Sequence, residues 1–107
     1  MAKTFFVKAK YTSAGTNALL KSGGSVRRQS VEKMMNDLGG SLESFYYSLN
    51  ADEAYIVCTM PDDITAAAVS LNVDSTGMVD CSIVPLLTPE DIDAAAKKVI
   101  HYRAPGQ

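Results

Sequence analysis

Five polar residues of this sequence could meet on one face of a β-sheet. They are Lys8, Tyr55, Thr59, Asp80 and Ser82, and each falls in a segment with the apolar/polar alternation of a strand. Polar groups that converge within an apolar surround are typical of small-molecule sites, and lysine, tyrosine and aspartate can also act as acids or bases. We therefore expect a ligand cavity over this face. The structural alternative is a cross-strand ion pair between Lys8 and Asp80, worth about 0.2 to 1 kcal/mol.

A second group of residues could bind an anion. Gly23-Gly24 breaks a helical stretch, Ser25 can cap the helix that follows, and Arg27 and Arg28 lie in its first turn. Free N–H groups of a helix start beside two guanidinium groups could hold a carboxylate or a phosphate. The segment does not match a phosphate-binding loop. Its structural interpretation is a helix break and cap followed by solvated arginines.

The other reactive side chains have no convergent partners in the sequence. His101, the single histidine, follows the last predicted helix beside Tyr102 and Arg103, where it is expected to make a helix-end contact. Cys58 and Cys81 form neither a CxxC motif nor a Cys/His cluster. The sequence therefore predicts no metal site and no cofactor, and these side chains do not identify a catalytic set.

Alternation, helix caps and glycine breaks predict the elements that position these residues. Strands are expected over residues 3–11, 41–49, 54–60 and 78–86. Helices are expected over residues 14–22, 26–38, 63–74 and 90–100. This order predicts the α+β class and a ferredoxin-like βαββαβ fold, with a four-stranded antiparallel sheet in spatial order 4-1-3-2 plus a C-terminal helix. We expect one domain over residues 1–107, of which about 101–107 form a loose tail.

The strand residues divide between two faces of this sheet. The side expected to meet the helices carries Phe5, Val7, Ala9, Ile56, Cys58, Met60, Val79, Cys81 and Ile83. The opposite side includes an apolar group, namely Phe6, Tyr55, Val57, Met78 and Val84. An exposed apolar patch of this kind usually marks an interface, so we expect a homo-oligomer, most simply a dimer with two sheets face to face. The alternative is that the C-terminal helix folds back over the patch; the register of residues 42–49 stays open.

The same strand order separates the two cysteines. Cys58 and Cys81 are expected on strands that lie on either side of the first strand, roughly 9 to 10 Å apart. A disulfide tolerates only about 7 Å between Cα atoms. Both residues are therefore predicted to be free thiols.

Composition and charge narrow the class of protein. The chain has 107 residues, of which 47% are hydrophobic and 21% charged, as in one globular domain. A net charge of -2 without long basic runs argues against a nucleic-acid partner. Lysines interrupt the apolar residues near the N-terminus, and no apolar run approaches the roughly 18 residues of a membrane span. We expect a cytoplasmic protein.

Several short motifs match a known family. They are Lys10-Tyr11-Thr12 with Gly15, Gly23-Gly24-Ser25 with Arg27-Arg28, Leu38-Gly39-Gly40, Phe45-Tyr46-Tyr47, Pro61-Asp62 and Leu86-Leu87-Thr88-Pro89-Glu90. Through them the chain resembles the GYD-domain proteins, short bacterial sequences of largely uncharacterised function. The Gly-Tyr-Asp turn of that family is replaced here by Asn50-Ala51-Asp52-Glu53, in which Asn50 can adopt the left-handed conformation of glycine. The resemblance implies membership of the wider dimeric α/β barrel group, and with it an oligomer.

Three functions are compatible with these patterns. The first is an oligomeric protein, auxiliary or ligand-binding, that holds a small molecule in a cavity over the sheet. The second is a cofactor-independent enzyme, monooxygenase-like or isomerase-like, with Tyr55, Lys8 or Asp80 as acid/base groups. The third is a structural protein-interaction module.

Overall fold

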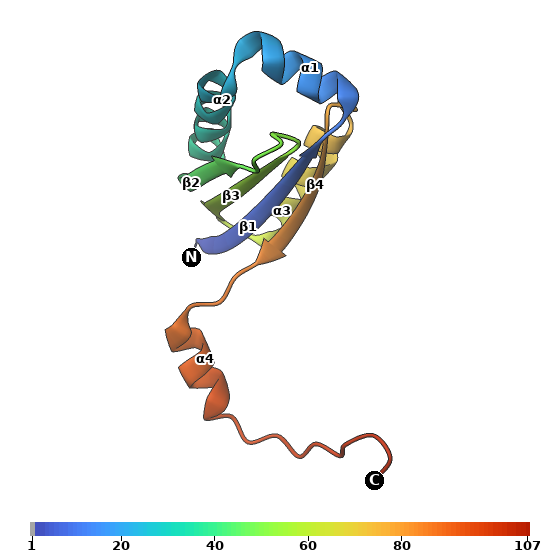
Figure 1. Ribbon diagram of the computed structural model, residues 1–107. Helices are drawn as coiled ribbons and strands as arrows, with labels where there is room; N and C mark the ends of the chain where they lie inside the picture. The colour runs from blue at the N-terminus through green and yellow to red at the C-terminus, as the bar shows by residue number, and fades with distance from the viewer. Residues whose placement is uncertain (1) are drawn as a thin grey trace.

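The computed structural model describes residues 2–107, so Met1, which the expected domain includes, lies outside the described residues. The elements follow one another as β1 (Lys3–Tyr11), α1 (Ser13–Ser22), α2 (Gly24–Asp37), β2 (Ser41–Tyr47), β3 (Glu53–Met60), α3 (Asp63–Asp74), β4 (Val79–Pro85) and α4 (Pro89–Ala96). The strands form one antiparallel sheet in the order β2-β3-β1-β4 (Figure 1). The predicted α+β class and strand order are confirmed.

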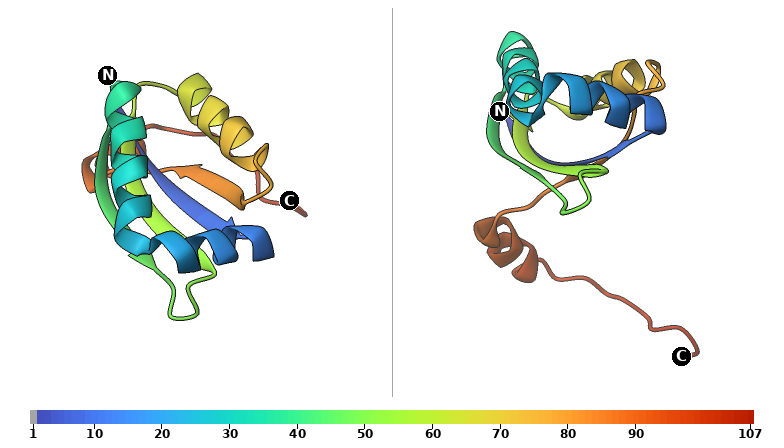
Figure 2. Two further views of the ribbon diagram at one scale, coloured as in Figure 1. Left: turned by 90° about the horizontal axis from the view of Figure 1, so that it is seen from above. Right: turned by 45° about the horizontal axis from the view of Figure 1, so that its top comes forward.

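Helices α1, α2 and α3 cover one face of the sheet (Figure 2). Alternate residues of β1 and β3 are buried beneath them, and the largest fully buried side chains are Met35, Met60 and Cys58. The helix-facing residues predicted for β1, β3 and β4 are buried or pack against this core. In the part of the chain that the structure describes, no element covers the opposite face, which we call the open face.

The start of α1 is tied to the start of β4. The Thr12 hydroxyl accepts a hydrogen bond from the Gly15 N–H at 3.2 Å, which caps α1, and donates one to the Gly77 carbonyl at 2.8 Å. Gly15 lies so close to this loop that an added Cβ would collide with the carbonyl oxygen of Met78. A glycine inside a helix is therefore explained here by close backbone packing.

Helix α2 begins two residues earlier than expected. Gly23, with φ at 83°, ends α1 and is itself the N-cap of α2, without a side-chain hydrogen bond to the helix. Ser25 therefore lies inside the first turn and does not cap the helix, contrary to the prediction.

A β-bulge explains why the register of residues 42–49 could not be assigned. The pairing of β2 with β3 shifts between Leu42 and Ser44, so Glu43 is the extra residue. As a result Leu42 lies opposite Cys58 and Phe45 opposite Ile56, and both pack against the core although their separation is odd. Simple alternation along the strand fails at this point.

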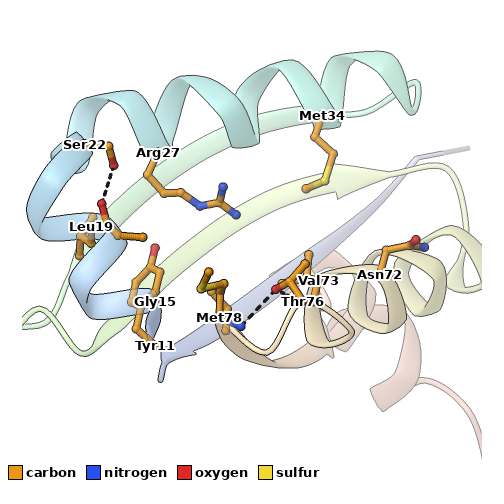
Figure 3. A pocket seen from close by; sticks show the side chains of 12 residues that line it. Tyr11, Gly15, Leu19, Ser22, Arg27, Met34, Asn72, Val73, Thr76 and Met78 are labelled. Atoms are coloured by element: carbon orange, nitrogen blue, oxygen red, sulfur yellow. Dashed lines mark hydrogen bonds between the residues drawn. The ribbon is translucent and has the colours of Figure 1, made fainter. Parts of the chain in front are cut away.

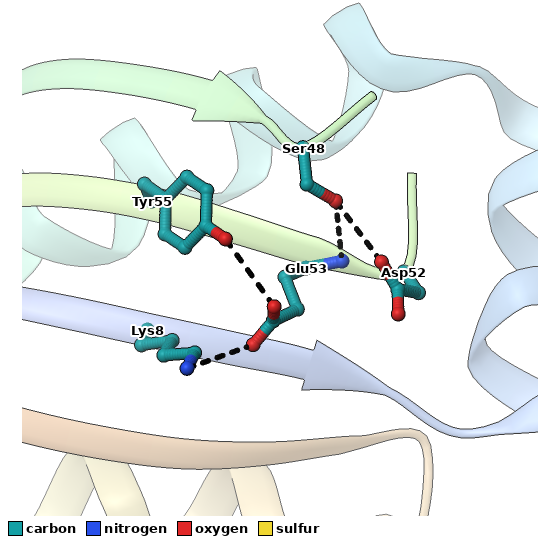
Figure 4. Close-up of polar contacts among 5 residues, drawn as sticks. All are labelled: Lys8, Ser48, Asp52, Glu53 and Tyr55. Atoms are coloured by element: carbon teal, nitrogen blue, oxygen red, sulfur yellow. Dashed lines mark hydrogen bonds and ion pairs between the residues drawn. The ribbon is translucent and has the colours of Figure 1, made fainter. Parts of the chain in front are cut away.

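The β2–β3 hairpin takes its left-handed residue from Ala51, with φ at 58°, and not from Asn50. The Ser48 hydroxyl donates a hydrogen bond to the Asp52 carboxylate at 3.0 Å and accepts one from the Glu53 N–H at 3.3 Å (Figure 4). These contacts hold the turn between β2 and β3.

The chain after β4 stands clear of the domain. We call residues 87–107 the C-terminal arm; it contains α4, which ends at Ala96, before the expected end at residue 100. The arm leaves the end of β4 on the side away from α1–α3 and does not fold back over the open face (Figures 1 and 2). The radius of gyration is accordingly 17.0 Å, compared with about 13 Å for a compact domain of this length. Among the described residues, no helix has the length and apolar character needed to cross a bilayer.

Candidate functional site

Three of the five predicted open-face residues form a row across the sheet. Lys8 on β1 lies opposite Tyr55 on β3 and opposite Ser82 on β4. Because β1 is the central strand of this trio, the side chains of the row are direct neighbours on the open face. The sequence analysis expected all five candidates to converge on this face, and the register makes three of them direct neighbours.

Glu53 organises this row, although sequence reasoning placed it in the hairpin turn. Lys8 Nζ lies 3.2 Å from Glu53 Oε2, and the Tyr55 hydroxyl donates a hydrogen bond to Glu53 Oε1 at 3.2 Å (Figure 4). Partial burial and then the adjacent Glu53 carboxylate raise the pKa of Tyr55. Lys8 thus pairs with Glu53 rather than with Asp80, and its half-exposed ion pair contributes at most about 1 kcal/mol.

The other two open-face candidates lie farther along the strands. Thr59 lies four residues, or about 13 Å, along β3 from Tyr55 and pairs with Thr4 on β1. The Thr59 hydroxyl lies 2.9 Å from the Ser41 hydroxyl. Asp80 pairs with Lys10. The five residues are thus spread over the open face of one copy, and their role in binding stays a prediction.

The predicted anion-binding residues diverge. Ser25 and Arg28 line a small surface hollow with Gly24, Phe45 and Tyr47. Arg27 points instead between the helices, where it is half-buried (Figure 3). The two neighbouring arginines therefore do not form one anion site.

Arg27 reaches into an apolar hollow on the helix side of the sheet, which we call the helix-side cavity. Its volume is about 430 Å³, and it lies between α1, α2, α3 and the ends of β1 and β4 (Figure 3). It is lined by Tyr11, Gly15, Ala18, Leu19, Ser22, Arg27, Met34, Asn72, Val73, Thr76, Met78 and Val79. Of these described lining residues, Arg27 alone carries a charge. A narrower hollow continues from the cavity toward Ile56 and Cys81 in the core.

Two tyrosines lie near Arg27, and one of them, Tyr11, lines the cavity. The rings of Tyr11 and Tyr47 stack with their centroids 6.3 Å apart, and the Tyr47 hydroxyl donates a hydrogen bond to the Gly24 carbonyl at 3.3 Å. Burial raises the pKa of Tyr47 to about 12; the neighbouring Tyr11 adds to the rise and the Arg27 guanidinium opposes it. Among the described residues, no ion pair or hydrogen bond engages the guanidinium of Arg27.

The cysteines are poor nucleophiles in this setting. Both are free thiols, as the strand order predicts. Burial raises the pKa of Cys58 to about 11, and burial followed by the Asp74 carboxylate raises the pKa of Cys81 to about 11. Because the thiolate is the reactive form, both side chains are largely unreactive near neutral pH.

Only one residue type in the sequence points directly to the helix-side cavity. Arg27 was a candidate, but for a helix-start site with Arg28. Tyr11, Met34 and Val79 have the spacing of ordinary core residues. The alternation of apolar and polar residues does not distinguish a residue that lines a cavity from one that packs in a solid core. His101 lies in the exposed arm beside other exposed residues.

The GYD domain family matches residues 5–96, from β1 to the end of α4. Neither a curated protein nor a solved structure gives a match. The matched segment contains the sheet except for Lys3 and Thr4 of β1, together with all of the open-face candidates and the helix-side cavity. The resemblance inferred from the short motifs is confirmed, and the chain belongs to the GYD domain family.

Proposed function

We propose that this protein binds a small organic acid, with the apolar part of the ligand in the helix-side cavity and its carboxylate on Arg27. The observation that carries the proposal is a cavity of about 430 Å³ whose apolar wall, as formed by the described residues, contains a single charged side chain. Sites for small organic molecules commonly have volumes of about 300 to 1,000 Å³ and a few placed polar groups in a largely apolar lining.

The wall chemistry fits an apolar ligand body. Leu19 from α1, Met34 from α2 and Val73 from α3 face the cavity from three directions (Figure 3). All three are partly buried. A bound hydrocarbon or aromatic group would remove their remaining exposed surface from water, with a gain of about 25 cal/mol per Å².

The charge at the wall fits a carboxylate. The Arg27 guanidinium is half-buried, and no protein carboxylate pairs with it among the described residues. Guanidinium groups bind carboxylates through two parallel hydrogen bonds, and such charged contacts contribute about 1.5 to 3 kcal/mol. The Tyr11 side chain borders the same space and offers a hydroxyl as a further donor.

The protonation states favour binding over catalysis. Tyr47, Cys58 and Cys81 have raised pKa values, so these groups stay neutral near pH 7. Neutral phenols and thiols act as weak donors and apolar surface rather than as bases or nucleophiles.

Titration with a matched pair of probes tests the proposal. Octanoate and 1-octanol share a hydrocarbon chain but differ in charge, and binding is followed by methyl resonances of Leu19, Met34 and Val73. We expect octanoate to shift these signals at concentrations where 1-octanol shifts them at least tenfold less. Equal binding of the two probes would show that the Arg27 charge does not contribute to binding. If neither probe shifts these resonances, the cavity is not a binding site and the proposal is wrong.

A further inference from the structure

Within residues 2–107, two apolar surfaces have no covering partner. On the open face, Phe6 stacks on Tyr55 with ring centroids 6.1 Å apart, Val57 lies beside them, and Val84 is 47% exposed. In the C-terminal arm, Ile92 is 54% and Val99 82% exposed. We propose that these surfaces cover each other between two copies, with the arm of one copy packed across the open face of the other.

Helix α4 has the properties of a segment that folds against a partner. Thr88 and Asp91 form a reciprocal capping box, and Pro89 occupies the first turn, so the start of the helix is well specified. All eight of its residues are nevertheless exposed. Isolated helices shorter than about 12 to 15 residues are marginal in water, so a helix of this length needs tertiary contacts to persist.

The sequence of the arm supplies an apolar stripe for such contacts. Ile92 and Ala96 are four residues apart on one side of α4, and Val99 lies three residues beyond the end of the helix. Asp93 lies between them, Glu90 and Asp91 precede Ile92 in the first turn, and all three acids can face water. Eight residues give α4 a length of about 12 Å, which matches the width of about 14 Å across four strands.

The direction of the arm points to a second copy as the occupant. The Leu86 N–H donates to the Thr4 carbonyl at 2.9 Å, which holds the chain at the end of β4, and Leu87 alone separates it from the Thr88 cap. From this anchored point the arm runs away from its own sheet (Figure 1). In a two-fold dimer each copy donates one arm and receives one. The open face and the arm of both copies are then covered. This exchange does not depend on ligand binding, because the helix-side cavity lies on the other side of the sheet.

Single changes on either surface of the full-length protein test the exchange. Ile92→Lys alters the arm, and Val84→Glu alters the open face. Leu71→Lys is the matched control, since Leu71 is 73% exposed on α3, on the helix-covered side. Sedimentation equilibrium measures the dimer dissociation constant, and far-UV circular dichroism checks that each variant is folded. We expect a dimer for the wild type and the control, and at least a tenfold higher dissociation constant for each of the other two variants.

Mixing the two variants distinguishes exchange from other arrangements. A heterodimer of Ile92→Lys with Val84→Glu keeps one unaltered arm-to-sheet contact and sets opposite charges in the other. We therefore expect the equimolar mixture to form dimers that neither variant forms alone. A dimer that survives Ile92→Lys unchanged would mean that the sheets pack without the arms and would overturn the proposal. A monomeric wild type at all concentrations would overturn it as well, since the arm would then be free or bound to its own sheet.

Discussion

Arg27 and Arg28 are adjacent in the sequence but line different hollows: Arg27 reaches into the helix-side cavity, whereas Arg28 borders a surface hollow beside Tyr47. On a helix, successive residues project about 100° apart, so one guanidinium turns toward the core and the other toward solvent. Substitution of Arg27 therefore removes a charge at the cavity, and the same substitution of Arg28 removes an equal charge outside it.

Replacement of Arg27 by Gln is expected to weaken octanoate binding by about 10- to 150-fold, the equivalent of a lost charged contact of about 1.5 to 3 kcal/mol. Arg28→Gln removes the same charge one residue away and is expected to leave the affinity within about twofold. Isothermal titration calorimetry of both variants measures the difference. Equal losses in the two variants would indicate a diffuse electrostatic effect in place of a contact with Arg27.

Gly15 is a position where local propensity and packing predict opposite results. Replacement of a helical glycine by alanine normally stabilises a helix by about 1 kcal/mol. Here the new Cβ would collide with the Met78 carbonyl, which is backbone and cannot rotate away. We expect Gly15→Ala to lower the free energy of unfolding by about 1 to 3 kcal/mol in urea titrations. Thr16→Ala, at an exposed position of the same helix, is the control, and a stabilised Gly15→Ala would show that α1 is free to move.

The residues that sequence reasoning placed correctly are those for which one local rule decides. Val7, Ile56 and Cys58 are buried because β1 and β3 alternate without interruption. Alternation did not assign Leu42 and Phe45 to the core, because the bulge at Glu43 changes which residues of β2 face the helices. Two helix caps, at Thr12 and Thr88, were equally predictable from residue type.

Features that depend on distant contacts were not predictable from the sequence. The apolar stripe of α4 indicates that Ile92 needs a partner, but periodicity does not say which surface it contacts. Likewise, Tyr11 and Met34 carry the signature of core residues, and only the relative placement of three helices leaves a cavity between them. Glu53 gained its contacts with Lys8 and Tyr55 from its register on β3, which begins one residue earlier than expected.

Two N-cap threonines are expected to contribute differently to stability. Thr12 caps α1 and also bonds the Gly77 carbonyl of the loop before β4, whereas Thr88 caps α4 in the exposed arm. Thr12→Val is expected to lower the free energy of unfolding by about 1 to 2 kcal/mol, through the lost cap and the unpaired groups it leaves. Thr88→Val is expected to change it by less than about 0.5 kcal/mol when measured at high dilution, where copies do not associate. Equal losses of unfolding free energy in the two variants would mean that α4 unfolds together with the rest of the domain.

The two cysteines are expected to make stability fall at alkaline pH. Their pKa values rise from 9.0 to about 11 on folding, so the unfolded chain releases these protons first as the pH increases. The stabilisation is therefore complete below about pH 9 and is lost progressively as the pH approaches about 11. Urea unfolding of the wild type and of the variants Cys58→Ala and Cys81→Ala, between pH 7 and pH 10.5, measures the effect. Each variant is expected to be less stable at pH 7 through lost packing, but to show a shallower decline in stability with pH than the wild type.

The same raised pKa values predict that iodoacetamide labels the folded protein at pH 8 at least tenfold more slowly than it labels the urea-unfolded chain, because the thiolate fraction is smaller. Fast labelling of the folded chain at pH 8 would contradict the burial of both thiols.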